Sequence, residues 1–503
     1  MLKVARCPSA SWIQIARLAV VALTLAAALP TTAESSDDAR RNLLIVLTED
    51  QGPYLSHLGT PGLSTPNMDA LVARGVYFHH GYVAYPVCSP SKAAMYTGMH
   101  SHANGLIENT NNVFKPAEQM SQAERNLSVY SRVQIRKPLI TLTQLLDHAG
   151  YYSGVSGKLH VAPNEKFPYD EWFKPNNYAR TKQFLANANS AEQPWFFFCN
   201  IQAPHRPYRD GDKVELTVEA SEVELPPFLP DTPAVRQDWT EYMDYIEVAD
   251  QQLGEVMRAV EEIGDPQNTV ILFMGDHGPP YHRGKMSLHQ FGLHVPFALV
   301  GPCVAEGVET DAMVSGVDVF PTLMDLLDLP IPSQIQGVSV AEVATEGQTG
   351  HDAGRPAVFA NIHHMGQQRD DGMQERSAFD GRWKLIFRDK PNEARVVNSD
   401  LEHFELRLPD GRVLPWRNRV YRDIIERKEE FPEAYHWLAR IDHKKFGIEL
   451  PMFELYDIEA DPWEFENLAG DPRHARELER MKAVLRDHLK TTGDLYVDLS
   501  LFD

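Results

Sequence analysis

Two pairs of polar residues follow apolar runs of strand type and could together bind a cation. Glu49 and Asp50 come after one run, and Asp276 and His277 come after another. Three carboxylates and an imidazole offer mostly hard oxygen ligands, which suit a divalent cation such as Ca²⁺. Taken singly, each acidic turn could also be an ordinary loop with no role in metal binding, because Asp and Gly are favoured in turns. The cation site is therefore expected only if the fold brings both turns together.

A cysteine lies between these turns in a segment rich in Ser and Pro. Cys88 is followed by Ser89, Pro90, Ser91 and Lys92, and the next residues have the pattern of a helix. The N-terminus of a helix stabilises anions and thiolates. This location suits a nucleophile.

The elements that must position these residues alternate along the chain. Buried-strand patterns cover residues 42–47, 195–201 and 270–274, and helical patterns cover 139–149 and 242–263. Such alternation predicts an α/β fold with a large, mostly parallel sheet covered by helices on both faces. Ligands of such sheets bind at the carboxyl ends of the strands, where both acidic turns lie.

The pattern of predicted elements changes after about residue 372. Residues 382–387 have the pattern of an antiparallel strand, and an amphipathic helix with Leu478, Met481, Leu485 and Leu489 closes the chain. We predict a catalytic domain over 34–372 and a smaller domain over 373–503.

The first 33 residues have the features of a cleaved signal peptide. Basic residues precede an apolar run at 18–29, and a small-residue site at 30–33 precedes an acidic stretch. The run is shorter than the ~20 residues that a spanning helix needs. We expect export to the periplasm or medium, with no stable membrane insertion after cleavage; an uncleaved anchor is the alternative.

Acidic residues outnumber basic ones. The 503 residues include 70 Asp and Glu against 48 Lys and Arg, which gives a formal charge of −22. A chain of this charge repels polyanions, so nucleic acid is not expected as a partner. The sequence does not indicate an oligomeric state.

The cysteine segment resembles a known family signature. Residues 88–92 with Thr97-Gly98 are similar to the Cys-x-Pro-Ser-Arg and Thr-Gly pattern of the type I sulfatases. Other segments similar to that family occur in its order, at 65–71, 156–160, 203–206, 284–285 and 454–468. The resemblance covers nearly the whole chain after residue 33. It implies an alkaline phosphatase-like fold with a smaller C-terminal α+β domain that carries an antiparallel sheet.

The resemblance also implies a mechanism. In the family, a maturation enzyme oxidises the signature cysteine to formylglycine, whose hydrate attacks the sulfur of a sulfated substrate. His205 or Lys285 would protonate the leaving group, and His160 would accept a proton from the hydrate. The implied catalytic residues are Cys88, Lys92, Lys158, His160, His205 and Lys285. The implied ligands of one Ca²⁺ are Glu49, Asp50, Cys88 in its modified form, Asp276 and His277.

Two residues depart from the family pattern. Glu49 stands where the family usually has an aspartate, and Lys92 stands where it has the signature arginine. The first change lengthens a carboxylate arm, and the second replaces a planar fork by a point charge.

Within the family, the resemblance is nearest to the heparan N-sulfatases. It rests on residues 88–91, 102–105, 158–163 and 363–364. It implies a sulfated sugar as substrate, such as a heparan-type N-sulfoglucosamine carrying an N-sulfate or O-sulfate.

Several alternatives and minor candidates accompany this interpretation. The chain could be a phosphoric or phosphonate ester hydrolase of the same superfamily, since phosphorus and sulfur centres share in-line displacement. It could also be a glycan-binding homologue with a decayed active site. Arg206 and Arg376 are candidates to meet a uronate or sulfate.

Overall fold

The computed structural model describes residues 40–110, 121, 134–208, 217–364, 372–394, 403–407, 413–417 and 419–503. The predicted signal peptide at 1–33 lies outside the described residues. The chain from Arg41 to Asp503 forms one compact unit.

A large mixed sheet forms the centre of this unit, as predicted. Its strand order is β4-β3-β5-β1-β6-β7-β2-β8, and β7 is the one strand that runs antiparallel to its neighbours in the described sheet. The strands that follow the predicted runs are β1 (Asn42–Thr48), β5 (Trp195–Ile201) and β6 (Thr269–Gly275). The others are β2 (Gly75–Tyr82), β3 (Tyr152–Ser156), β4 (Glu171–Phe173), β7 (Phe297–Val300) and β8 (Val308–Ser315).

Alternation along β1 divides the core into two layers. Leu43, Ile45 and Leu47 pack on one face, and Leu44 and Val46 pack on the other, because successive side chains of a strand point to opposite faces. All seven residues of β1 are buried. The continuous apolar run therefore reflects a strand that is covered on both sides.

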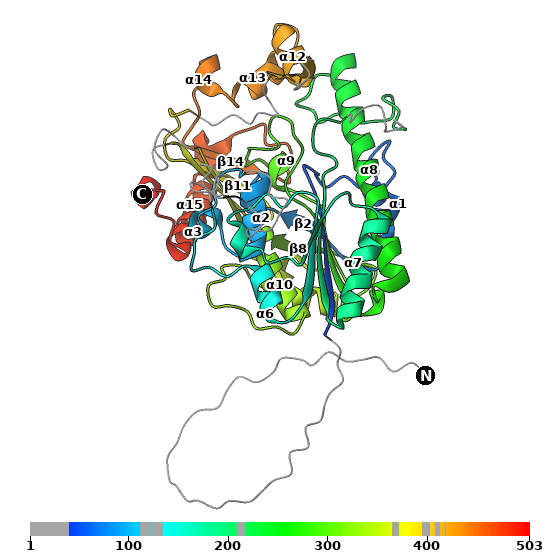
Figure 1. The fold of residues 1–503 in the computed structure, drawn as a ribbon. Helices are drawn as coiled ribbons and strands as arrows, with labels where there is room; N and C mark the ends of the chain where they lie inside the picture. Colours follow the sequence, from blue (N-terminus) through cyan, green and yellow to red (C-terminus); the bar gives the residue numbers. More distant parts are fainter. Residues whose placement is uncertain are drawn as a thin grey trace, which may run out of the picture. The chain divides into compact units, whose positions relative to one another are not determined.

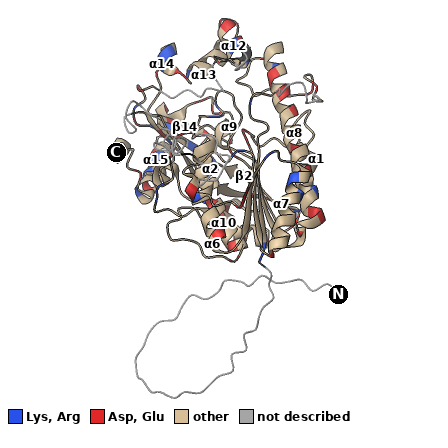
Figure 2. Ribbon diagram, in the orientation of Figure 1, with Lys and Arg blue, Asp and Glu red and all other residues tan. Residues whose placement is uncertain are grey.

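Helices cover both faces of the sheet (Figure 1). One face packs against α1 (Pro66–Val72), α7 (Tyr178–Ala191) and α8 (Pro233–Ile263). The other packs against α2 (Cys88–Thr97), α6 (Leu142–His148) and α10 (Val319–Leu326). Figure 2 shows charged residues on the outer helices and few on the central strands.

A second, antiparallel sheet has the order β14-β11-β10-β9. Its strands are β9 (Val358–His363), β10 (Gln374–Phe379), β11 (Trp383–Arg388) and β14 (Phe453–Asp457). The closing helix α15 (Ala475–Thr492) packs on it through Met481, Leu485 and Leu489, as the sequence pattern predicts. The sheet takes β9 from before residue 373, and the domain division at that residue stays a proposal.

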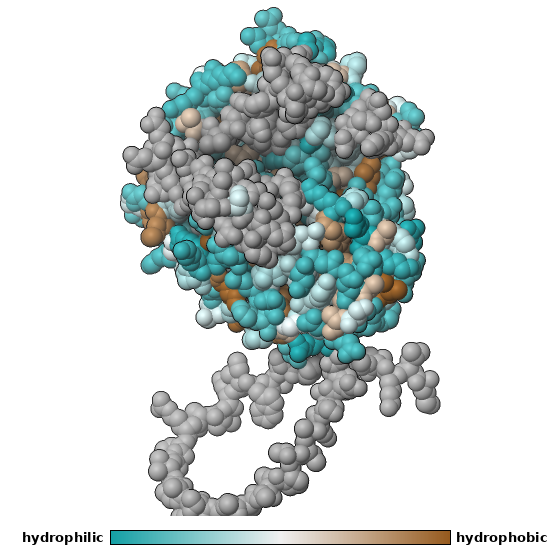
Figure 3. Space-filling model, viewed as in Figure 1, coloured by the Kyte–Doolittle hydropathy of each residue, from teal (hydrophilic) through white to brown (hydrophobic). Residues whose placement is uncertain are grey.

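The remaining elements are short. They are α3 (Ser101–Asn104), α9 (Gln290–Leu293), α11 (Ala341–Glu346), α12 (Arg419–Glu426), α13 (Pro432–Ala439), α14 (His443–Phe446), and the pair β12 (His403–Arg407) and β13 (Val413–Arg417). The visible described surface is mostly hydrophilic, with small scattered apolar areas (Figure 3). Within the described ranges, no helix has the length and apolar character needed to cross a membrane.

Candidate active site

The two acidic turns meet because β1 and β6 are adjacent parallel strands. Thr48 lies opposite Gly275 in their register, so Glu49-Asp50 and Asp276-His277 leave the sheet side by side. The Asp50 amide donates to Asp276 Oδ1 at 2.9 Å. The condition for a cation site is met, since both turns lie at one edge of the sheet.

Cys88 is the first residue of α2, and it points into the same place. Its Sγ lies 3.2 Å from His277 Nε2, and the side chain is buried. One turn further along, Ser91 Oγ donates to the Asp276 carbonyl at 2.6 Å. This bond ties the start of α2 to the turn after β6, so the thiol is held against the acidic turns.

Glu49 is the centre of a buried ionic cluster. Lys92 Nζ contacts its Oε1, and Lys158 Nζ donates to its Oε2 at 2.6 Å. Asn200 Nδ2 donates to Oε1 at 3.0 Å. The pKa of Glu49 is lowered: burial would raise it, but the charges of Lys158 and Lys92 prevail. Glu49 is therefore a carboxylate with partners on both oxygens.

Asp50 is held in a similar way. Lys285 Nζ donates to its two oxygens at 3.1 and 3.2 Å, and His277 Nε2 lies 3.2 Å from Oδ1. His205 Nε2 lies 3.4 Å from Lys285 Nζ. Asp50 adopts a left-handed backbone conformation, with φ of 59°, which is uncommon for a residue other than glycine.

The local electrostatics favour an anion at residue 88. Burial alone would raise the pKa of the Cys88 thiol, but Lys158, Lys285 and His277 bring it well below its ordinary value. The pKa of His277 is raised to about 9, because Asp276, Cys88 and Asp50 outweigh its burial. A negative nucleophile or substrate group would thus meet a positive environment.

The two predicted proton carriers have opposite character. Burial and the charge of Lys158 lower the pKa of His160 to about 4, so this imidazole is neutral near pH 7. Burial would lower the pKa of His205 as well, but Asp50 raises it above the ordinary value. The pair combines a base with a potential acid, and both imidazoles hydrogen-bond Cys88.

The donors present fit a divalent cation. Ligand atoms of Glu49, Asp50, Cys88 and His205 lie within 4.8 Å of one another, and so do those of Cys88, Asp276 and His277. Asp276 Oδ2 is buried and has no hydrogen-bond partner among the described residues. Burial and the nearby Glu49 raise the pKa of Asp276, as expected for carboxylates crowded without a cation. All five predicted metal ligands are therefore brought together, and His205 joins them.

Asn200 is a site residue that the sequence analysis missed. Besides binding Glu49, Asn200 accepts a hydrogen bond from the Lys158 backbone amide on its Oδ1 at 3.0 Å. Its Nδ2 also donates to the Leu47 carbonyl at 3.3 Å. It orients an acid and a lysine at once. Its position at the carboxyl end of β5 was the available signal, because that is where the other strand-end residues gather.

The two minor arginine candidates lie elsewhere. Arg206 forms a buried two-pronged pair with Asp238, and Arg376 pairs with Asp494 at 2.6 Å. Both guanidinium groups have carboxylate partners inside the protein. The suggestion that they bind a substrate anion is not supported by this geometry.

Solved structures share this fold. A protein in complex with its substrate D-glucosamine-2-N,6-O-disulfate aligns over 91% of this chain and 99% of its own, with TM-score 0.62 and 17% identity. A phosphonate monoester hydrolase from Silicibacter pomeroyi aligns over 91% and 96%, with TM-score 0.63 and 16% identity. These likenesses show the fold: a large, mostly parallel sheet with a separate antiparallel sheet, as in the solved sulfatase structures.

The sequence model of the sulfatase family matches residues 41–329, and the chain belongs to that family. An ulvan-active sulfatase of Formosa agariphila is 26% identical over 90% of this chain and 76% of its own length. Human N-sulphoglucosamine sulphohydrolase is 24% identical over 91% of both chains. The protein is a sulfuric ester hydrolase.

Proposed function

We propose that the protein removes an N-sulfate or O-sulfate from a glycan, most specifically from a heparan-type N-sulfoglucosamine. The observation that carries the proposal is the buried Cys88 at the start of α2, facing His277 at 3.2 Å. The likeness to human N-sulphoglucosamine sulphohydrolase along 91% of both chains supports the choice of sugar.

The nucleophile in this proposal is formylglycine, made from Cys88 by a maturation enzyme. An ionised hydroxyl of its hydrate attacks sulfur while the bond from sulfur to the sugar oxygen or nitrogen breaks. His205, or Lys285 beside it, gives the leaving atom its proton. His160 takes the proton of the second hydroxyl; the bond from carbon to the sulfate oxygen then breaks, which releases sulfate and restores the aldehyde.

The lysines supply positive charge around the sulfate. Lys92 and Lys158 are anchored on Glu49, and Lys285 is anchored on Asp50. Because these contacts fix the ammonium groups before substrate arrives, little reorganisation is needed as charge develops. Glu49, Asp50, residue 88, Asp276 and His277 would hold Ca²⁺, which when bound would polarise a sulfate oxygen.

We also propose that the protein is exported. The support is the signal-like pattern of residues 1–33. N-terminal sequencing of protein from the native host would locate the mature start, and a chain that begins at Met1 would contradict cleavage.

The first test is mass spectrometry of the peptide that contains Cys88, on protein made in the native host. The expected result is an aldehyde in place of the thiol. A panel of N-sulfated and O-sulfated sugars follows, with Cys88→Ala as the inactive control. A thiol in all of the protein would remove the proposed nucleophile.

A phosphoric or phosphonate ester hydrolase is the second candidate. The likeness in fold to a phosphonate monoester hydrolase favours keeping it, since one fold can host more than one hydrolytic chemistry. The same panel should include phosphate and phosphonate esters. Turnover of these esters, with no sulfate released from any sugar, would favour the second candidate. A decayed, glycan-binding homologue would turn over neither class.

A further inference from the structure

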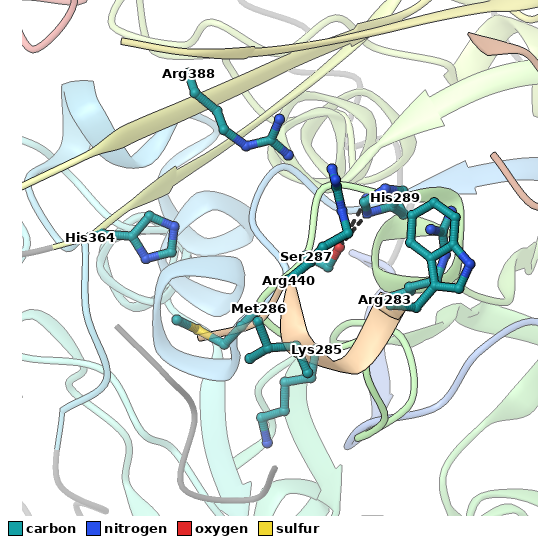
Figure 4. A pocket seen from close by; sticks show the side chains of 10 residues that line it. Arg283, Lys285, Met286, Ser287, His289, His364, Arg388 and Arg440 are labelled. Atoms are coloured by element: carbon teal, nitrogen blue, oxygen red, sulfur yellow. Dashed lines mark hydrogen bonds between the residues drawn. The ribbon is translucent and has the colours of Figure 1, made fainter. Parts of the chain in front are cut away.

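A small basic pocket adjoins the proposed active site through Lys285. Lys285, Arg283, His364, Arg388 and Arg440 line it (Figure 4). In Figure 4 the Lys285 side chain extends away from Arg388. Its ammonium group reaches Asp50 in the active site, so this one residue belongs to both places.

The other two arginines of the pocket have carboxylate partners, whereas one N–H donor group of Arg283 lacks an acceptor among the described residues. Arg388 lies 3.0 Å from Glu454 and Arg440 contacts the same carboxylate. Arg283 Nη2 donates to the carbonyl groups of Trp463 at 2.5 Å and Glu464 at 2.9 Å. Its Nη1 is buried with no hydrogen-bond partner among the described residues.

An unpaired guanidinium donor in the interior is costly, which points to a ligand. Arg283 is only 5% exposed, and leaving a charged donor without an acceptor costs more than leaving a neutral one. Arg283 also has a left-handed backbone, with φ of 67°. At the neighbouring Gly284 a Cβ atom would lie 2.1 Å from the Pro279 carbonyl oxygen, so the turn that places Arg283 and Lys285 is sterically fixed.

An aromatic cleft continues from this pocket. It has a volume of about 830 Å³, and it shares Trp437 and Arg440 with the pocket. Its walls include Phe228, Tyr456 and Phe465. The Arg283 guanidinium lies 4.1 Å from the Trp437 ring centroid and 5.5 Å from that of Phe465. Aromatic walls beside placed polar groups are typical of small-molecule sites of this size.

We propose that Arg283 is a specificity-determining residue whose Nη1 binds an anionic group on the sugar that adjoins the reacting sugar, while the aromatic cleft holds that adjoining sugar. The inference rests on the proposed function, because it places the reacting sulfate near Lys285. The anionic group is a carboxylate or a second sulfate, since guanidinium recognises both. The preferred substrate is thus at least a charged disaccharide.

The test measures binding without turnover, in a Cys88→Ala background. The ligands are a disaccharide of hexuronic acid linked to N-sulfated glucosamine, its uronate methyl ester, and that ester with a 2-O-sulfate. Calorimetric titration should show the ester binding about 10-fold more weakly than the acid, as expected for a lost charged hydrogen bond. Arg283→Gln should bind acid and ester equally, and Arg283→Lys should be intermediate. Tight binding of the sulfated ester would identify sulfate as an accepted anion.

Matched controls separate the anion contact from the fold and from the cleft. Arg382→Gln removes a half-exposed arginine that pairs with Asp457, and it should leave the preference for acid unchanged. Phe465→Ala should weaken acid and ester to the same extent, because an aromatic ring offers no hydrogen bond to an anionic group; the residue is 39% exposed. Melting temperatures of all variants verify folding.

Two results would overturn the inference. One is equal affinity for acid and ester, or no binding of either, in the Cys88→Ala protein; the other is an unchanged preference in Arg283→Gln. Sulfate release from glucosamine N-sulfate by the mature protein is measured separately. If that release occurs while acid and ester bind equally, the anion contact is wrong and the proposed function stands.

Discussion

Lys92 Nζ contacts Glu49 Oε1 in the interior of the site, and both side chains are fully buried. These are the two residues that depart from the family pattern. Glu is one methylene longer than the usual aspartate, and Lys lacks the extended fork of the usual arginine. The longer acid meets the shorter cation, so the two departures form a matched pair. This argues against a decayed site, in which the contact would not be preserved.

The first prediction is a double-mutant cycle on this pair. Glu49→Asp withdraws the carboxylate from Lys92 and Lys158, and Lys92→Arg forces a larger cation against Glu49. We expect each change alone to lower kcat/KM about 10-fold or more, and the double variant to recover part of the loss, with a coupling of about 0.5–3 kcal/mol. Strictly additive losses would contradict compensation between the two positions.

The second prediction concerns calcium and stability. Ca²⁺ at about 100 times its dissociation constant should stabilise the folded protein by about 2.7 kcal/mol, and a chelator should reverse the effect. Asp276→Asn should abolish the calcium-dependent rise in melting temperature. Without calcium it should not destabilise the protein, because burial and Glu49 already raise the pKa of Asp276.

A matched control for calcium lies beyond the other end of β6. Asp265→Asn changes an exposed residue just before β6, at the opposite end from Asp276, and Asn tolerates the left-handed backbone there. It should keep the full calcium response. A calcium response that survives Asp276→Asn would exclude this residue from the cation site.

The fold could be predicted where a local pattern reports it. β1, β5 and β6 are continuous apolar runs because they are buried on both faces, and α15 shows its buried stripe of leucines. The antiparallel direction of β7 was not predicted, because strand direction depends on connections that a four-residue run does not encode.

The sequence predicts which residues form the candidate site, but not which of these side chains pair with one another. Cys88 and the strand-end acids meet as expected, whereas the choice of Lys92 and Lys158 for Glu49, and of Lys285 for Asp50, was not predicted. These partners are separated by 43, 109 and 235 positions. Such contacts depend on tertiary packing. The role of Asn200 was not predicted for the same reason, since its contacts with Lys158 and Glu49 are both long-range.

The third prediction tests the structural role of Arg206. Its guanidinium pairs with Asp238 and lies 4.4 Å from the Tyr208 ring centroid. Arg206→Ala should lower the free energy of unfolding by about 3–5 kcal/mol, because it leaves the buried Asp238 unpaired. The exposed pair of Arg422 and Glu426 is the control, where Arg422→Ala should cost about 0–1 kcal/mol in urea unfolding. Full stability with lost activity would instead place Arg206 at the substrate.

The fourth prediction concerns a cluster of histidines between α3 and α15, of which His100 and His102 are buried and His488 is half-buried. His488 lies 4.7 Å from His100 by ring centroids, and His100 lies 5.7 Å from His102. Burial lowers the pKa of His102 to about 4 and that of His488 to about 3, with His102, Arg355 and Arg376 assisting at His488. Asp494, 3.6 Å from His102, only partly opposes this effect.

The sign of the pH effect follows from these shifts. Between pH 6.5 and about 4, the unfolded chain binds protons at these histidines while the folded chain does not, so stability falls as the pH falls. His488→Phe should keep the stacking contact with Phe359 and remove one of these protonation sites. The variant should therefore lose about 2–3 kcal/mol less than the parent between pH 7 and pH 4, measured by urea unfolding. Parallel stability curves for the two proteins over that range would show that His488 is not held neutral by the fold.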